Sequence, residues 1–198
     1  LIENNFNVYV IDSLKNSSIE NLSLIKKVCS KYHKASKGKI TFYEGDIRDK
    51  EFLIDTFKNA QLGGNPIEAV IHFAGLKSVN ESIKEPLSYW ETNVCGTNNL
   101  LNVMQIYNCK KIVFSSSATV YKPVQNRSIN EESELGPINP YGQTKLAVEN
   151  MLGDLMKDKS QNWKIINLRY FNPVGAHISG LLGENPKGIP NNLFPIIL

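Results

Sequence analysis

Short apolar segments alternate with segments of helical periodicity along most of this chain, and this alternation restricts the possible folds more than any other feature. Residues 69–73, Ala-Val-Ile-His-Phe, form a near-continuous apolar run, which is typical of a strand covered by helices on both faces. Residues 7–12, 39–44, 111–114 and 164–168 have a similar character and predict four further strands. Alternating strands and helices without an internal repeat predict an α/β fold, a doubly wound (Rossmann-like) parallel sheet in three α/β/α layers.

Helical periodicity and end signals place helices between these strands. Asn139 followed by Pro140 is a strong helix start, because an asparagine side chain caps the first turn and proline is tolerated there. Residues 169–198 contain many glycines and prolines and are predicted to form loops. The predicted helices cover approximately residues 17–34, 50–59, 86–107 and 140–157.

Composition restricts the possible partners and compartment. The chain has 198 residues, 41% of them hydrophobic and 21% charged, which is ordinary for a globular domain with a substantial core. A net charge of +3, without a basic stripe interleaved with aromatic residues, argues against a nucleic-acid partner. No apolar run approaches membrane-spanning length, so no membrane association and a soluble, cytoplasmic protein are predicted.

Cysteine and histidine positions indicate neither a disulfide framework nor a metal site. Cys29, Cys95 and Cys109 lack Cys-x-x-Cys spacing, so free thiols in a reducing compartment are the simplest interpretation. His72 lies inside a predicted buried strand and is interpreted as a core histidine, and no ligand cluster accompanies His177. We therefore predict no bound metal.

Two segments place reactive side chains where the carboxyl end of a strand meets a helix. Serines occupy positions 115–117 after a predicted strand, and Tyr141 and Lys145 lie four residues apart on one face of a predicted helix. A nearby ammonium lowers the pKa of a tyrosine, and a serine hydroxyl can bind the same substrate oxygen. Ligands bind at such strand ends in open α/β sheets, so a proton-transfer site for alcohol–ketone chemistry is predicted. The Tyr/Lys spacing alone would also fit an ordinary exposed helical pair.

Longer motifs at the strand ends resemble a known family. The segment Ser-Ser-Ala-Thr-Val-Tyr at 116–121 is similar to the extended, nucleotide-sugar-modifying branch of the short-chain dehydrogenase/reductase superfamily. The full set is Asp12 with Asn16, residues 46–47, His-Phe-Ala-Gly-Leu-Lys at 72–77, Asn93, residues 115–117, Arg-Tyr-Phe-Asn-Pro-Val-Gly-Ala at 169–176, and residues 189–193. In order and spacing it closely resembles the UDP-glucose 4-epimerase (UDP-galactose 4-epimerase) family over essentially the whole chain.

The resemblance implies an NAD-dependent interconversion of UDP-glucose and UDP-galactose through a transient 4-keto sugar. Ser117 and Tyr141 would face the hexose 4-hydroxyl, and Tyr141, as phenolate, would take its proton while C4 gives a hydride to NAD. Lys145 would hold the nicotinamide ribose and acidify Tyr141. The ketone would rotate and take the hydride back on its other face, so the cofactor would stay bound.

The resemblance also implies binding roles for individual residues. Those implied for NAD are Asp12, Asn16, Asp46, Ile47, Phe73, Ala74, Gly75, Lys77, Asn93, Ser115, Tyr141, Lys145, Tyr170 and Phe171. Those implied for the UDP-sugar are Lys77, Ser117, Tyr141, Asn172, Asn192 and Leu193.

The family pattern extends beyond both ends of these residues. Counting back from Asp12 places the glycine-rich phosphate loop before residue 1. We interpret residues 1–170 as an NAD-binding Rossmann-like domain truncated at its N-terminus, and residues 171–198 as the start of the substrate-binding region. We expect the segment alone to be inactive and the full-length protein to be a homodimer.

Other functions remain as alternatives. A 4,6-dehydratase is disfavoured, because that class carries an Asp-Glu pair where this chain has Ala118 and Thr119. Epimerases acting on UDP-glucuronate or UDP-xylose share the Ser/Tyr/Lys set and remain open. A non-catalytic dinucleotide-sensing or scaffold protein is the alternative from another class, and the intact Ser117, Tyr141 and Lys145 set argues against it.

Overall fold

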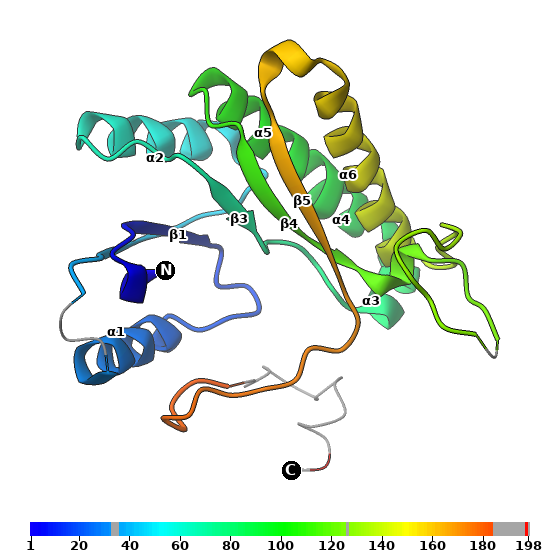
Figure 1. Ribbon diagram of the computed structural model, residues 1–198, viewed down its shortest axis with the longest axis horizontal. Helices are drawn as coiled ribbons and strands as arrows, with labels where there is room; N and C mark the ends of the chain where they lie inside the picture. Colours follow the sequence, from blue (N-terminus) through cyan, green and yellow to red (C-terminus); the bar gives the residue numbers. More distant parts are fainter. Residues whose placement is uncertain (33–35, 126, 184–196, 198) are drawn as a thin grey trace. The chain divides into compact units, whose positions relative to one another are not determined.

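The computed structural model describes residues 1–32, 36–125, 127–183 and 197. Its chain divides into two compact units, Leu1–Asp46 with Asn172–Leu198 and Ile47–Phe171 (Figure 1). Helices and strands alternate as predicted. In chain order the elements are η1 (Ile2–Asn4), β1 (Val8–Asp12), α1 (Glu20–Tyr32), β2 (Ile40–Glu44), α2 (Lys50–Leu62), β3 (Val70–His72), α3 (Val79–Lys84), α4 (Pro86–Tyr89), the π-helix η2 (Trp90–Cys95), α5 (Gly96–Ile106), β4 (Lys111–Ser117), η3 (Ala118–Val120), α6 (Pro140–Lys157), η4 (Lys159–Gln161) and β5 (Lys164–Tyr170).

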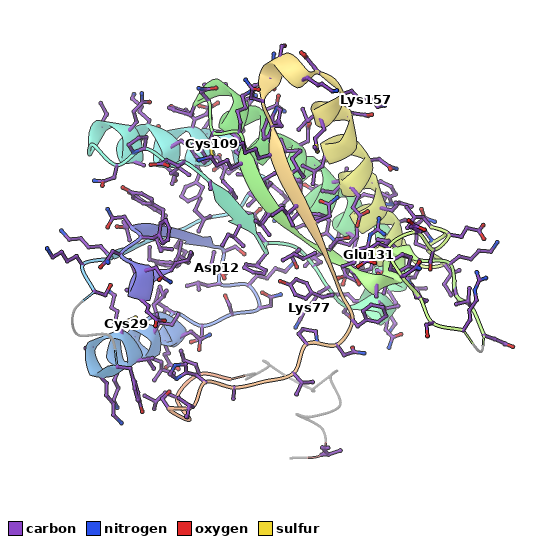
Figure 2. All side chains as sticks on the ribbon, in the orientation of Figure 1. Asp12, Cys29, Lys77, Cys109, Glu131 and Lys157 are labelled. Atoms are coloured by element: carbon purple, nitrogen blue, oxygen red, sulfur yellow. The ribbon has the colours of Figure 1, made fainter. Side chains whose placement is uncertain are left out.

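The first unit contains a parallel pair of strands. β1 and β2 are paired in register from Val8 with Ile40 to Asp12 with Glu44. Parallel strands need a crossover connection, and α1 provides it here. The carboxylate of Asp12 lies at the carboxyl end of β1 (Figure 2).

The second unit contains a parallel sheet in the order β3-β4-β5. Figure 1 shows α5 and α6 on one face of this sheet, and α6 contacts both β4 and β5. Parallel sheets flanked by helices confirm the predicted Rossmann-like α/β class. The buried core of this unit is formed by the sheet, by α5 and α6, and by α2, which packs against α5. It includes Leu53, Phe57, Tyr89, Val103, Met104, Ile112, Phe114, Val120, Val148 and Leu152.

Strand alternation and register decide which side chains of β4 meet α6. Successive side chains of a strand point to opposite faces, and register partners in a parallel sheet share a face. Ser116 is the register partner of Arg169, whereas Ser117 is the partner of Tyr170. Ser116 lies on the face that carries the buried Phe114, and Ser117 lies on the other face.

The predicted helix over residues 86–107 forms in three parts, because the π-helix η2 interrupts it between α4 and α5. Asn93 lies in this π-helical segment, and π-helices are frequent at functional sites. The short helix α3 was not predicted. Its start is nevertheless readable, because Ser78 caps it by accepting a bond from the backbone N–H of Glu81, the Ser-x-x-Glu pattern of a capping box.

Two strands extend further than the apolar pattern predicts. β4 continues through Ser117 and β5 through Tyr170, because these residues pair with each other across the sheet. In the part of the chain that the structure describes, no helix combines the length and the apolar character needed to cross a membrane.

Candidate active site

The start of α6 and the end of β4 bring the predicted Ser/Tyr/Lys set together. Asn139 caps α6, as predicted, by accepting a hydrogen bond from the backbone N–H of Gly142 at 2.8 Å. This start places Tyr141 and Lys145 on one face of the helix, with the Lys145 Nζ atom 5.8 Å from the centre of the Tyr141 ring. Lys145 Nζ donates a 2.7 Å hydrogen bond to the backbone carbonyl of Ser115.

The two titratable groups of this set are shifted mainly by burial. Lys145 is only 5% exposed, and burial lowers the pKa of its ammonium to about 8. Burial also raises the pKa of Tyr141, and a hydrogen bond with Ser117 lowers it only in part. The pKa of Tyr141 thus lies above its ordinary value in this geometry, because desolvation of the phenol outweighs the bond with Ser117, and the acidification of Tyr141 by Lys145 stays a prediction.

The hydroxyl of Ser117 is held by its own turn. Its Oγ atom accepts hydrogen bonds from the backbone N–H and from the hydroxyl of Thr119, at 3.2 Å and 3.0 Å. A hydroxyl has one donor and two acceptor positions, so these two bonds leave the Ser117 proton for donation to Tyr141 or to a bound hydroxyl. Ser117 can thus share an oxygen ligand with Tyr141.

The loop after β3 is fastened to this set by Asn93, which is 3% exposed. Its Oδ1 atom accepts a bond from the backbone N–H of Leu76, while its Nδ2 atom donates to the Leu76 carbonyl and to the Thr144 hydroxyl. Gly75 has a φ of +150°, and a Cβ atom there would lie 2.9 Å from Asn93 Oδ1. Asn93 therefore clamps the β3 loop to α6, and its contact with a cofactor stays a prediction.

Most of the remaining predicted residues of the second unit follow the carboxyl ends of its strands, and Ile47 precedes α2. Lys77 is exposed in the loop after β3 (Figure 2). Phe73 and Phe171 are exposed by 63% and 64%, which leaves both rings available to a ligand. Tyr170 is the register partner of Ser117, and Ala74 follows Phe73 with partial exposure. Ile47 is buried, and a Cβ atom on Gly96 would lie 2.8 Å from its side chain.

The other predicted residues do not belong to this group. Asp12, Asn16, Asp46 and Asn172 belong to the first unit. There the Asp12 carboxylate accepts bonds, both at Oδ1, from the backbone N–H of Leu14 and the hydroxyl of Ser17. The predicted substrate contacts Asn192 and Leu193 lie outside the residues that the structure describes.

Sequence reasoning missed several residues that contact this site. The fully buried Tyr89 packs edge-on against Tyr141, with ring centres 6.4 Å apart, and its hydroxyl bonds Ser78 and Glu81. Thr144, which lies between Tyr141 and Lys145 on α6, is fully buried and accepts a hydrogen bond from Asn93. The sequence carries no local signal for Tyr89.

Glu149 was also missed, although the sequence holds a signal for it, and Arg169 was noted only as part of a family motif. Glu149 continues the four-residue spacing of Tyr141 and Lys145 along one face of α6. Its carboxylate forms an ion pair with Arg169 on β5, with Arg169 Nη2 and Glu149 Oε2 2.7 Å apart.

His72 has the expected structural role. It is 3% exposed, and its Nε2 atom lies 2.8 Å from the hydroxyl of Thr97. Burial, helped by the charge of Lys145, lowers the pKa of His72 to about 3, so the ring stays neutral. Over the described ranges, no cluster of His, Cys, Asp or Glu could hold a metal ion.

Comparisons with known proteins match nearly all of the chain. Residues 1–193 match one family model, described as GDP-mannose 4,6 dehydratase. The chain is 47% identical over 197 residues to a UDP-glucose 4-epimerase of Bacillus subtilis, covering 100% of this chain and 54% of that protein. It is 46% identical to a bifunctional UDP-glucose 4-epimerase and UDP-xylose 4-epimerase of Pisum sativum, again covering 100% of the chain and 54% of the relative.

A solved structure supports the same relationship. The crystal structure of UDP-glucose 4-epimerase from Bifidobacterium longum in complex with NAD⁺ and UDP matches with a TM-score of 0.86 and 43% identity. The match covers 100% of this chain and 55% of that one. The resemblance inferred from the motifs is thereby confirmed. The chain spans about half the length of the curated relatives it matches.

Proposed function

This chain belongs to the family described as GDP-mannose 4,6 dehydratase, and on that premise we propose that the whole protein interconverts UDP-glucose and UDP-galactose with bound NAD. The observation that carries the proposal is the convergence of Ser117, Tyr141 and Lys145 at the end of β4. The names of the relatives, several of them UDP-glucose 4-epimerases, supply the substrate class.

Each of the two units carries side-chain groups of the kinds that bind a dinucleotide. Both bonds accepted by Asp12 use Oδ1, so its Oδ2 atom can accept a bond from a ribose hydroxyl at the adenosine end. An ammonium has three N–H donors, and Lys145 gives one to Ser115, so it can also bind the hydroxyls of the nicotinamide ribose. Bound NAD would accept the hydride from the sugar C4 atom, return it, and add a positive ring charge that favours the Tyr141 phenolate.

The proton transfers follow from the geometry of the three side chains. Tyr141 takes the proton of the 4-hydroxyl, and the Lys145 ammonium, protonated below about pH 8, stabilises the charge that the phenol oxygen carries. Ser117 donates to the same sugar oxygen. In the return step Tyr141 gives the proton back, so the site ends the cycle in its starting protonation state.

An observation at η3 favours epimerisation over dehydration. Loss of water from the hexose needs an acid that protonates a leaving hydroxyl, and Ala118 and Thr119 provide none at this position. Thr119 is also committed to Ser117 through its N–H and its hydroxyl. UDP-xylose is a second candidate substrate, because the Pisum sativum relative is named for both epimerisations.

The proposal is tested by assaying the whole protein against UDP-galactose, UDP-xylose and UDP-glucuronate in parallel. Tyr141→Phe should lower turnover by about 10²- to 10⁴-fold, the usual contribution of a general acid–base, with little change in NAD affinity. Full activity of this variant would exclude Tyr141 as the base. NAD binding without turnover of any sugar would favour the non-catalytic dinucleotide-sensing alternative.

Two accompanying proposals concern the organisation of the protein. Residues 1–170 form the NAD-binding domain, residues 171–198 begin the substrate-binding region, and the whole protein is a homodimer. Residues 1–198 expressed alone should show no turnover, because they span about half the length of the relatives they match. Light scattering and the same sugar assay check these expectations.

A further inference from the structure

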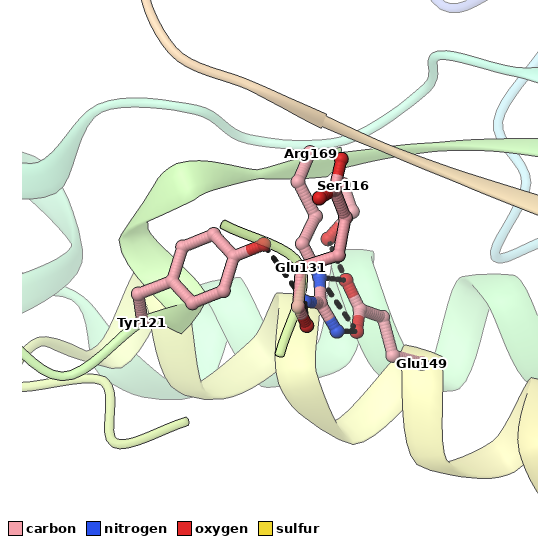
Figure 3. Close-up of polar contacts among 5 residues, drawn as sticks. All are labelled: Ser116, Tyr121, Glu131, Glu149 and Arg169. Carbon is pink, nitrogen blue, oxygen red and sulfur yellow. Dashed lines mark hydrogen bonds and ion pairs between the residues drawn. The ribbon is translucent and has the colours of Figure 1, made fainter. Parts of the chain in front are cut away.

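A largely buried ion pair joins α6 to β5 beside the proposed catalytic set. Glu149 is 7% exposed and lies on α6 (Figure 3). Lys145 lies one turn before it on the same helix. Arg169 Nε donates to Glu149 Oε1 at 3.0 Å and Arg169 Nη2 to Oε2 at 2.7 Å, which is the two-pronged geometry that fixes orientation best. The hydroxyl of Ser116 donates to the same Oε1 atom.

Both strand partners of Glu149 are set by the sheet register. Ser116 on β4 and Arg169 on β5 are direct register partners, so their side chains emerge together on the face that meets α6. The Glu149 carboxylate on α6 therefore bonds to directly paired residues of two adjacent strands. On either side of Ser116 are Ser115 and Ser117, which bond Lys145 and Tyr141.

The strand and the helix are thus joined at three consecutive residues. Tyr141, Lys145 and Glu149 follow one another at four-residue spacing, and each contacts one member of the serine run at 115–117. Two of these contacts belong to the proposed reaction set. The third joins Ser116 to Glu149, and neither of these residues belongs to the proposed reaction set.

The same arginine reaches the segment that follows the strand. Arg169 Nη1 donates to the Tyr121 hydroxyl at 2.9 Å and to the Glu131 carbonyl at 3.4 Å (Figure 3). The segment from 121 to 135 is closed by a hydrogen bond from the Lys122 N–H to the Glu134 carbonyl. Arg169 on β5 therefore bonds both to Glu149 on α6 and to this segment.

We propose that Ser116, Glu149 and Arg169 form a brace that positions the Tyr141 and Lys145 face of α6 against the end of β4. These are positioning residues, since they act through Tyr141 and Lys145 rather than on the substrate. A buried carboxylate is costly unless it is paired and hydrogen-bonded, so geometries in which Glu149 keeps both partners are favoured. Its link to turnover rests on the proposed function.

The test uses two variants that leave the net charge unchanged, Ser116→Ala and Arg169→Lys. Each weakens the brace, because the first removes a donor and the second replaces the planar fork by a single ammonium. We expect kcat to fall about tenfold or more, since small misplacements of reacting groups have large effects on rate. The KM for the UDP-sugar should stay within about twofold, because no brace residue is placed at the substrate.

A second readout needs neither substrate nor turnover. The pKa of Lys145, followed by NMR of isotopically labelled lysine and assigned with Lys145→Met, should rise toward its ordinary value as a loosened helix lets water reach the ammonium. Its titratable neighbours, Tyr141 on α6 and His72 on β3, are unchanged in both variants.

A matched control lies on the same helix. Asp154 pairs with Lys157 at 2.6 Å, but both side chains are largely exposed, so Asp154→Asn should leave kcat and the Lys145 titration unchanged. An unchanged Lys145 pKa in the folded variants would overturn the proposal, whatever happens to kcat. Should Arg169→Lys fail to fold, Ser116→Ala decides alone. Lack of turnover in the unmodified protein would remove the proposed function but not the titration test.

Discussion

The buried Lys145 ammonium should lower the stability of the folded protein. Replacement of Lys145 by methionine tests this directly. The ammonium is 5% exposed and its pKa falls from 10.5 to about 8 because burial disfavours the charged form. Methionine has a similar length and no charge, so Lys145→Met removes the buried ammonium while keeping most of the packing.

The magnitude follows from linkage between protonation and folding. Each pH unit by which a pKa differs between the folded and unfolded states is worth about 1.4 kcal/mol, so the fall to about 8 costs about 3 kcal/mol. The folded state binds this proton less tightly than the unfolded state does. The cost is therefore fully present below pH 8 and disappears as the pH rises through 10.5.

The variant also loses the hydrogen bond from Lys145 to the Ser115 carbonyl, which is worth about 1 kcal/mol. At pH 7 we expect Lys145→Met to be more stable than the unmodified protein by about 2 kcal/mol and to lack turnover. Toward pH 10 the two stabilities should become nearly equal, because most of the unfavourable protonation is then gone.

The assay is denaturant unfolding of both proteins, prepared without NAD, at several values between pH 7 and pH 10. Lys157→Met is the control, since Lys157 is exposed and its replacement should produce no comparable dependence on pH. The stability difference between Lys145→Met and the unmodified protein should therefore change over this range. A constant difference would refute the claim that burial of the Lys145 ammonium destabilises the folded state.

Two further predictions concern the backbone and the core. Gly75→Ala should lower the free energy of unfolding by about 1–3 kcal/mol, because φ is +150° and the new Cβ atom would lie 2.9 Å from Asn93 Oδ1. Gly153→Ala is the control at a helical position with open space around it, and it should raise the free energy of unfolding by about 0.5–1 kcal/mol. Equal shifts of the thermal midpoint in the two variants would contradict this prediction. Because burial lowers the pKa of His72 to about 3, stability should be lost as the pH falls below 6.5, and His72→Gln should reduce that loss in acid unfolding followed by circular dichroism.

Local patterns were sufficient to predict most of the helices and strands of this chain. The cap at Asn139 and the spacing of Tyr141 and Lys145 need only neighbouring residues, and both have the predicted geometry. The short helix α3 also has a local signal in Ser78 and Glu81, so it could have been predicted. These features depend on hydrogen bonds within one turn, which sequence spacing determines.

Features that depend on packing between distant segments could not be predicted in this way. Glu149 meets Ser116 and Arg169 only because β4 and β5 pair in one register and α6 covers that face. The raised pKa of Tyr141 has the same origin, since it depends on the burial of the phenol rather than on the spacing to Lys145. Residue type and spacing identify the groups of the site but not their electrostatic balance.

The serine run shows why three consecutive residues serve one site. Ser115 contributes its carbonyl to Lys145, Ser116 sends its hydroxyl to Glu149, and Ser117 presents its hydroxyl to Tyr141. Because side chains alternate along a strand, a slip of one residue would put Ser115 or Ser117 in the place of Ser116 and move the reactive hydroxyl to the other face. The ion pair with Arg169 binds α6 to β5 at the level of Ser116, so it stabilises the one register in which all three serines meet their partners.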